Sequence, residues 1–151
     1  MGVAERLAEA GLEIPAVPAP VAVYVPATTS GSHVYTAGQL PLRDGELLAT
    51  GKVGAGVTPE TGYECARQCA LNAIAAVASQ VDDIDRVRIV KVVVFVASDV
   101  EFTGQPGVAN GASELFGLAF GDQGVHARSA VGVPVLPLDA PVEVEVVAEL
   151  L

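Results

Sequence analysis

One arginine stands apart in the second half of the chain as a residue that could do chemistry. After Lys91 the sequence holds eight Asp and Glu residues but a single Lys or Arg, which is Arg128. A guanidinium presents a rigid fork of N–H donors that matches the two oxygens of a carboxylate. Arg128 is therefore suited to holding a small organic acid. The alternative is an ion pair within the chain, with Asp122, Glu143 or Glu145.

His126 lies two residues before Arg128, near the start of an expected strand, and is a second candidate for chemistry. Residues two apart on a strand point to the same side of a sheet, so the imidazole is expected on the face of Arg128. An imidazole can give or take a proton near neutral pH. The alternative is a structural or solvent-facing histidine, as we expect for His33 beside a predicted turn.

The composition argues against several classes of partner. The chain has 151 residues, with 8 Lys and Arg against 18 Asp and Glu and a formal net charge of −10. An acidic surface repels phosphate backbones, so we expect no nucleic-acid partner. Cys65 and Cys69 have no His-rich or Cys-rich neighbourhood that would complete a zinc site, so we expect reduced core thiols and no metal. With no predicted membrane span or signal peptide, we expect no membrane partner and a cytoplasmic protein.

Two hairpins and a helix are predicted in the first half of the sequence. Residues 21–39 contain two β-rich runs around a polar turn, and residues 43–46 form a second turn sequence that includes glycine. Thr58 is placed to cap a helix with Pro59 in its first turn, and helical spacing of apolar residues continues to Val77. We expect this helix to bury a face of small residues.

The second half predicts a helix and three strands. Residues 86–97 are nearly continuous in Val and Ile, which is typical of a central strand covered on both faces. Residues 108–119 have helical spacing, a strand begins near Arg128, and residues 142–150 alternate apolar and polar side chains. This order favours an α+β fold in which two helices pack on one face of a mixed sheet. The other face lacks a cover, so we expect a homo-oligomer.

We expect one domain at residues 21–151, preceded by an N-terminal arm at residues 1–20. A length of 151 residues is usual for one domain. Leu7 and its apolar neighbours predict a short amphipathic helix that ends near Gly11, and the following PAVPAP sequence predicts an extended segment.

Six short motifs occur in order from Tyr24 to the end of the sequence. They are Tyr24 with VYTAGQLP at 34–41, ARQ at 66–68 with Asn72, VKVVVFV at 90–96, Phe102 with Asn110, Glu114 and Phe116, ARS at 127–129 with Leu136 and Pro137, and VEVE at 142–145 with Ala148. In this order they resemble the reactive-intermediate deaminase family, also called Rid, YjgF-like or endoribonuclease L-PSP.

This resemblance implies a chorismate-mutase-like fold, in which three subunits bury their sheets around a central barrel and leave clefts between subunits. It also implies hydrolysis of small reactive enamines or imines, the 2-imino acids, to 2-keto acids and ammonia. The expected partner is thus a small carboxylate-bearing metabolite bound by a homotrimer. An imine carbon is already electrophilic, so this chemistry requires no cofactor.

The resemblance also implies roles for individual residues. Arg128 corresponds to the carboxylate clamp and Glu143 to the group that orients or activates the attacking water. Tyr24 corresponds to a wall of the intersubunit cleft and Gly38 to a point of close backbone approach. Asn110 is a candidate for the cleft rim, Ala130 for a contact through its backbone carbonyl, and His126 for the same pocket.

The sequence departs from the family pattern beside these residues. Ala37 replaces a usual hydroxyl, Ala130 stands where deaminating members often have cysteine, and residues 103–107 lengthen a loop. These changes indicate a divergent branch. Two other functions follow as alternatives: a non-catalytic trimer that binds or senses keto acids, and a ribonuclease, which the net charge of −10 disfavours.

Overall fold

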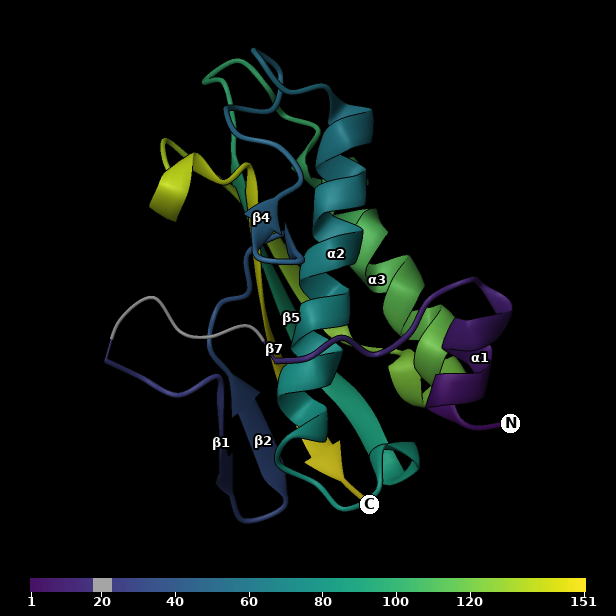
Figure 1. Ribbon diagram of the computed structural model, residues 1–151. Helices are drawn as coiled ribbons and strands as arrows, with labels where there is room; N and C mark the ends of the chain where they lie inside the picture. The colour runs from purple at the N-terminus through teal and green to yellow at the C-terminus, as the bar shows by residue number, and fades with distance from the viewer. Residues whose placement is uncertain (18–22) are drawn as a thin grey trace.

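The computed structural model describes residues 1–17 and 23–151, with a five-stranded sheet at the centre (Figure 1). The strands are β1 (Ala27–Ser30), β2 (His33–Thr36), β5 (Val87–Ala97), β6 (Ala127–Val133) and β7 (Val142–Leu150). Their order across the sheet is β1-β2-β7-β5-β6, and β5 runs parallel to β6 but antiparallel to β7. The mixed sheet predicted from the sequence is therefore confirmed.

Both predicted turns are present. β1 and β2 form an antiparallel hairpin, and a second small hairpin joins β3 (Leu42–Arg43) to β4 (Glu46–Leu47). In that second turn Asp44 and Gly45 have φ values of 53° and 81°, the left-handed pair that matches the twist of a tight hairpin. Residues 21 and 22, at the start of the predicted hairpin segment, lie outside the described residues.

Two long helices cover one face of the sheet, and a short one lies beside them (Figure 1). The three are α1 (Val3–Glu9), α2 (Pro59–Ala78) and α3 (Gln105–Phe120), and short 3-10 helices span Ile84–Arg86, Gly121–Gly124 and Pro137–Asp139. The predicted start of α2 is confirmed, because the Thr58 hydroxyl accepts a 3.1 Å hydrogen bond from the Thr61 backbone N–H.

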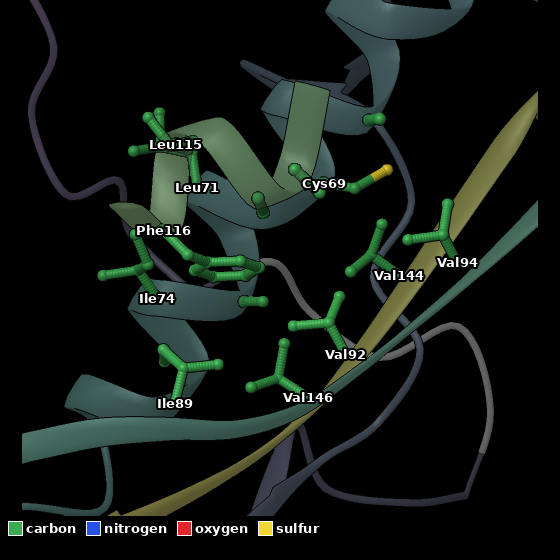
Figure 2. Packing of buried hydrophobic residues seen from close by; sticks show 14 of the residues in the cluster. Cys69, Leu71, Ile74, Ile89, Val92, Val94, Leu115, Phe116, Val144 and Val146 are labelled. Atoms are coloured by element: carbon green, nitrogen blue, oxygen red, sulfur yellow. The ribbon is translucent and has the colours of Figure 1, made fainter. Parts of the chain in front are cut away.

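The core fills the space between the sheet and α2 and α3. Val92 and Val94 of β5 and Val144 and Val146 of β7 point toward these helices, where Phe116 and other apolar side chains meet them (Figure 2). The two helices approach closely, because any side chain at Gly111 of α3 would collide with the backbone of α2. The small-residue face predicted for α2 is confirmed separately, because Ala66, Ala70 and Ala73 of that helix are buried.

The opposite face of the sheet is only partly covered. Burial alternates along β5: Val92 and Val94 are buried, whereas Lys91, Val93 and Phe95 on the other face are half-buried. Within the described chain, β5 is therefore fully covered on one face only, not on both as its apolar sequence suggests. The expected subunit contact on the second face stays a prediction.

The segment at residues 1–17 lies against the main body of the protein. Val3 and Leu7 of α1 are buried, and the Val3 backbone N–H donates to the Asp85 carboxylate at 2.7 Å. Arg6 donates to the Ala119 carbonyl near the end of α3 at 3.3 Å. The predicted short helix is therefore confirmed, while the division of the chain at residue 20 stays a prediction.

Candidate functional site

Arg128 lies on β6, at the edge of the sheet, and its side chain reaches toward α3. β6 pairs in parallel with β5 so that Arg128 is opposite Val92, whose side chain faces the helices. The guanidinium Nη1 donates to Asn110 Oδ1 at 2.8 Å and to Ser113 Oγ at 3.1 Å. Nη2 donates to the Pro106 carbonyl at 3.4 Å. The register of β6 and the start of α3 together fix this side chain.

Neutral oxygens are the partners of the Arg128 guanidinium. Within residues 1–17 and 23–151 the two ion pairs are Lys52 with Asp139 and Arg88 with Glu149, and neither includes Arg128. The intrachain ion pairs considered for Arg128 are thus not formed there. Three of its five N–H groups donate to the protein, which leaves two donors and a full positive charge for a ligand.

His126 joins the same group of side chains through Ser113. The imidazole Nδ1 lies 2.6 Å from the Gly124 carbonyl oxygen, and Nε2 lies 2.9 Å from Ser113 Oγ. The ring also meets Phe116 edge to face, with 5.9 Å between ring centroids. The Ser113 hydroxyl therefore contacts both His126 and Arg128. We call Asn110, Ser113, His126 and Arg128 the Arg128 cluster.

Ser113 is the member of the Arg128 cluster that the sequence analysis did not identify. Ser113 follows Asn110 by three positions, so both side chains lie on one face of α3. That spacing was visible in the sequence, but nothing in it indicated that this face of the helix meets β6.

Glu143 lies on the other side of the sheet. It stands on β7 between Val142 and Val144, both buried toward the helices, so its side chain points away from them. A side chain at Gly38 would collide with the Glu143 carboxylate, and this explains the glycine at that position. With Glu145, two residues along the same face, these residues form what we call the Glu143 patch.

The Glu143 carboxyl is an uncommon acid for a surface strand. Burial raises the pKa of Glu143, and the nearby negative charge of Glu145 raises it further. Both effects favour the protonated form, so the carboxyl can exchange a proton closer to neutral pH than an exposed glutamate can.

Ala130 and Tyr24 are the remaining predicted site residues. Ala130 pairs with Val94 on β5 and is half-buried beside the core, two positions along β6 from Arg128. Tyr24 precedes β1 and is 45% exposed, next to Val23 and Val25, which are also exposed. The described chain brings Asn110, His126 and Arg128 together and places Gly38 against Glu143, but it leaves the two groups on opposite sides of the sheet.

A hollow of about 330 Å³ lies elsewhere, where α1 meets the end of α3. Its lining includes Met1, Arg6, Asp85 and Phe120, and none of the predicted site residues. In the described ranges no group of three or more His, Cys, Asp or Glu side chains could hold a metal ion. The same ranges contain no helix with the length and hydrophobicity needed to cross a membrane.

Comparisons with known proteins agree with this architecture. The family described as "YjgF/chorismate mutase-like, putative endoribonuclease" matches residues 4–150. Protein TCP17 of Trypanosoma cruzi is 45% identical over 150 residues, which covers 98% of this chain and 94% of TCP17. A crystal structure described as a "putative endoribonuclease" from Shewanella oneidensis MR-1 is 34% identical, with a TM-score of 0.96 over 99% of this chain and 100% of that one.

A more distant solved structure carries a ligand. The crystal structure of E. coli TdcF with bound serine is 26% identical to this chain, with a TM-score of 0.65, and the match covers 88% of this chain and 92% of TdcF. From the match to residues 4–150 and the 45% identity to TCP17, we conclude that the chain belongs to the YjgF/chorismate mutase-like family.

Proposed function

We propose that this protein hydrolyses small reactive enamines and 2-imino acids to 2-keto acids and ammonia, in clefts between the subunits of a homotrimer. The observation that carries the proposal is that the Arg128 guanidinium is held in place but has unused hydrogen-bond donors. Its guanidinium is held by three neutral oxygens and keeps two donors free. A half-buried cation of this kind, with no carboxylate partner among the described residues, is suited to receive the carboxylate of a substrate.

The separation of Arg128 from Glu143 supports a cleft between subunits. Arg128 reaches toward α3 from one side of the sheet, and Glu143 points away from the helices on the other. A second copy of the chain can bring its Glu143 patch to the Arg128 cluster. The half-buried apolar residues of the open face, which include Val93, Phe95 and Val147, are suited to the contact that such an assembly requires.

The proposed reaction needs a positioned water and one proton carrier. The Glu143 carboxylate takes a proton from water while the water oxygen attacks the imine carbon, and the carbon–nitrogen π electrons move to nitrogen. Glu143 returns this proton to the nitrogen, which gives a neutral carbinolamine. The carbinolamine hydroxyl then passes its proton to the Glu143 carboxylate as the carbon–nitrogen bond breaks, and the departing nitrogen takes that second proton from Glu143 and leaves as ammonia. The raised pKa of Glu143 supports this double role of base and acid.

Arg128 contributes by orientation rather than by proton transfer. A carboxylate bound to two N–H donors cannot rotate freely, so the adjacent imine carbon has a defined place relative to the water. The serine bound to TdcF is itself a small molecule with a carboxylate beside an amine. A 2-imino acid has the same arrangement of carboxylate and nitrogen, which supports the proposed substrate class.

A carboxylate-binding trimer without catalysis is the second candidate function. Ala37 and Ala130 flank the proposed cleft without any side-chain polar group, so the clamp is retained while less chemistry surrounds it. Such a protein would bind keto acids at Arg128 and release them unchanged. A ribonuclease is a weaker candidate, because a net charge of −10 opposes binding of an RNA backbone.

Ammonia release in the presence of an imine-producing amino-acid oxidase tests the proposal. The wild-type protein should accelerate ammonia release, and Arg128→Ala should reduce the acceleration by about 100-fold or more, because a charge-assisted bidentate contact is lost. Arg43→Ala is the matched control, since Arg43 is an exposed residue of β3 that donates to Gln68 away from the site. Saturable, Arg128-dependent binding of 2-ketobutyrate without any acceleration would select the binding function instead.

A further inference from the structure

A chain of hydrogen bonds runs from the Gly124 carbonyl through His126 and Ser113 to Arg128. Its successive distances are 2.6 Å from the Gly124 oxygen to Nδ1, 2.9 Å from Nε2 to Ser113 Oγ, and 3.1 Å from Oγ to Arg128 Nη1. The direction of each bond follows from the chemistry of its ends. A carbonyl only accepts, so Nδ1 carries a proton, and when the imidazole is neutral Nε2 accepts the Ser113 hydroxyl proton. The Ser113 oxygen is left to accept from Arg128.

We propose that Ser113 and His126 are positioning residues that hold the Arg128 guanidinium in the orientation needed to bind a substrate carboxylate. The inference rests on the proposed function only in taking a carboxylate as the ligand of Arg128. It requires no turnover, so it applies equally to a protein that binds keto acids without changing them.

The hydrogen-bond pattern determines which edge of the guanidinium meets the ligand. Both N–H groups of Nη1 are used, one by Asn110 and one by Ser113. Nε has no partner within the described residues, and Nη2 has one long contact of 3.4 Å to the Pro106 carbonyl. Nε and Nη2 lie along one edge of the guanidinium, and that edge can receive both oxygens of a carboxylate.

The imidazole of His126 is held on three sides. Gly124 comes so close to the backbone of Phe116 that any side chain there would collide with it, and this contact sets the position of the Gly124 carbonyl. The Phe116 ring meets the imidazole edge to face. An arginine side chain on an edge strand would otherwise sample many rotamers, and each rotamer excluded before binding reduces the entropy lost on binding.

A Ser–His pair can also activate serine as a nucleophile, but the contacts around Ser113 favour positioning. The hydroxyl accepts a hydrogen bond from the Arg128 cation, which withdraws electron density from the oxygen that would attack. The same contact occupies one of the two lone pairs. Ser113 thus acts through Arg128 and not as a catalytic residue.

Calorimetric titration of the 151-residue protein with 2-ketobutyrate tests the proposal. Ser113→Ala and His126→Phe should each raise the Kd about tenfold, because a hydrogen bond that orders the clamp is lost. Ser113→Thr keeps the hydroxyl and His126→Gln keeps an acceptor toward Ser113, so both should stay within about threefold of wild type. Ser32→Ala, in an exposed hairpin turn, and His33→Gln are matched controls with unchanged Kd.

Two further readouts separate positioning from general stability. In the ammonia assay Ser113→Ala should raise KM and leave kcat nearly unchanged, whereas partial unfolding would lower the active fraction. Long-range ¹H–¹⁵N spectra of the wild type should show His126 protonated on Nδ1. A Ser113→Ala variant that is folded and binds as tightly as wild type would overturn the proposal, as would covalent labelling of Ser113 by a fluorophosphonate.

The outcomes also distinguish this proposal from the proposed deaminase activity. Arg128-dependent binding without turnover, weakened by Ser113→Ala, would refute the deaminase and support positioning. Turnover that depends on Arg128 but does not change in the Ser113 and His126 variants would support the deaminase activity and refute the positioning role. A wild-type protein that binds none of 2-ketobutyrate, pyruvate and benzoate would overturn the positioning proposal together with the clamp.

Discussion

The Arg128 cluster and the Glu143 patch are built on opposite principles. In the cluster a cation is held by neutral hydrogen-bond partners from α3, and it keeps its charge and two of its donors. In the patch two carboxylates stand close together on β7, where burial and repulsion act against ionisation of Glu143. One region holds an ordered cation that no carboxylate neutralises, and in the other the raised pKa of Glu143 favours its protonated form. The Arg128 cluster offers a positive charge and hydrogen-bond donors, and the Glu143 patch offers a carboxyl that can exchange a proton.

Within one chain the Arg128 cluster and the Glu143 patch lie apart, on opposite faces of the sheet. Arg128 and Glu143 belong to strands on either side of β5, and their side chains point to opposite faces. Under the proposed function, a reaction that uses both side chains would draw Arg128 from one subunit and Glu143 from another, because strand alternation places them on opposite faces of the sheet.

Mixing two inactive variants gives the largest expected effect. Arg128→Ala and Glu143→Gln homotrimers should both be inactive, but random mixed trimers should recover about a quarter of wild-type activity, because about one interface in four joins an intact Arg128 to an intact Glu143. The measurement is ammonia release after the two proteins are unfolded and refolded together. The same proteins refolded separately and then combined serve as the control.

No recovery in the mixed sample would contradict the division of the site between subunits. It would mean that Arg128 and Glu143 act from the same chain, or that one of them has no part in the reaction. The two cases separate on titration with 2-ketobutyrate, since Glu143→Gln should retain carboxylate binding and Arg128→Ala should not.

Much of the fold could be predicted from the sequence because its signals are local. Thr58 and Pro59 mark a helix start by their own chemistry, and the Asp44–Gly45 turn needs only residues that accept a positive φ. The alternation of residues 142–150 likewise predicts that Glu143 lies on the other face of the strand from the buried valines, and this prediction does not require the partner strands to be known. These features depend on a few neighbouring residues.

The site was harder to predict because its contacts depend on long-range packing. Spacing alone places His126 and Arg128 on one face, and the structure brings them to the same hydroxyl. That hydroxyl belongs to Ser113, whose role depends on the register of β6 against β5 and on where α3 crosses the sheet edge. Similarly, the helical period of α1 is local, but its contact with Asp85 spans 82 residues.

Gly38→Ala should damage the Glu143 patch while leaving the Arg128 cluster intact. The new methyl group would collide with the Glu143 carboxylate, so that side chain must move from its place. We expect ammonia release to fall by about tenfold and the free energy of unfolding to fall by about 1–2 kcal/mol, as for other overpacked positions. Binding of 2-ketobutyrate, measured by calorimetry, should change little.

Gly45→Ala is a useful comparison for this variant, because Gly45 has open space around its Cβ position but a φ of 81°. It should lose stability through backbone strain without losing activity at equal folded fraction. If Gly38→Ala behaved in the same way, with activity preserved, the contact between Gly38 and Glu143 would have no role in the reaction.

The smallest expected effect concerns the pH dependence of stability. Because burial and Glu145 raise the pKa of Glu143 in the folded protein above its unfolded value, its contribution to stability is complete at low pH and is lost as the pH rises through the folded pKa. Glu143→Gln removes this titration. The variant should therefore melt about 1–3 °C above wild type at pH 7, and the difference should vanish below the ordinary glutamate pKa of about 4.3, where the wild-type carboxyl is protonated in both the folded and the unfolded protein. Melting curves of both proteins across this range provide the measurement. Glu149→Gln is the comparison, since Glu149 is paired with Arg88 and its substitution removes a favourable contact instead.

A Glu143→Gln variant that was less stable than wild type at pH 7 would contradict this prediction. It would show that a positively charged group of another subunit pairs with the ionised Glu143 carboxylate. The contrast between an unpaired Arg128 cation and a Glu143 carboxyl that resists ionisation would then hold for the single chain but not for the assembly.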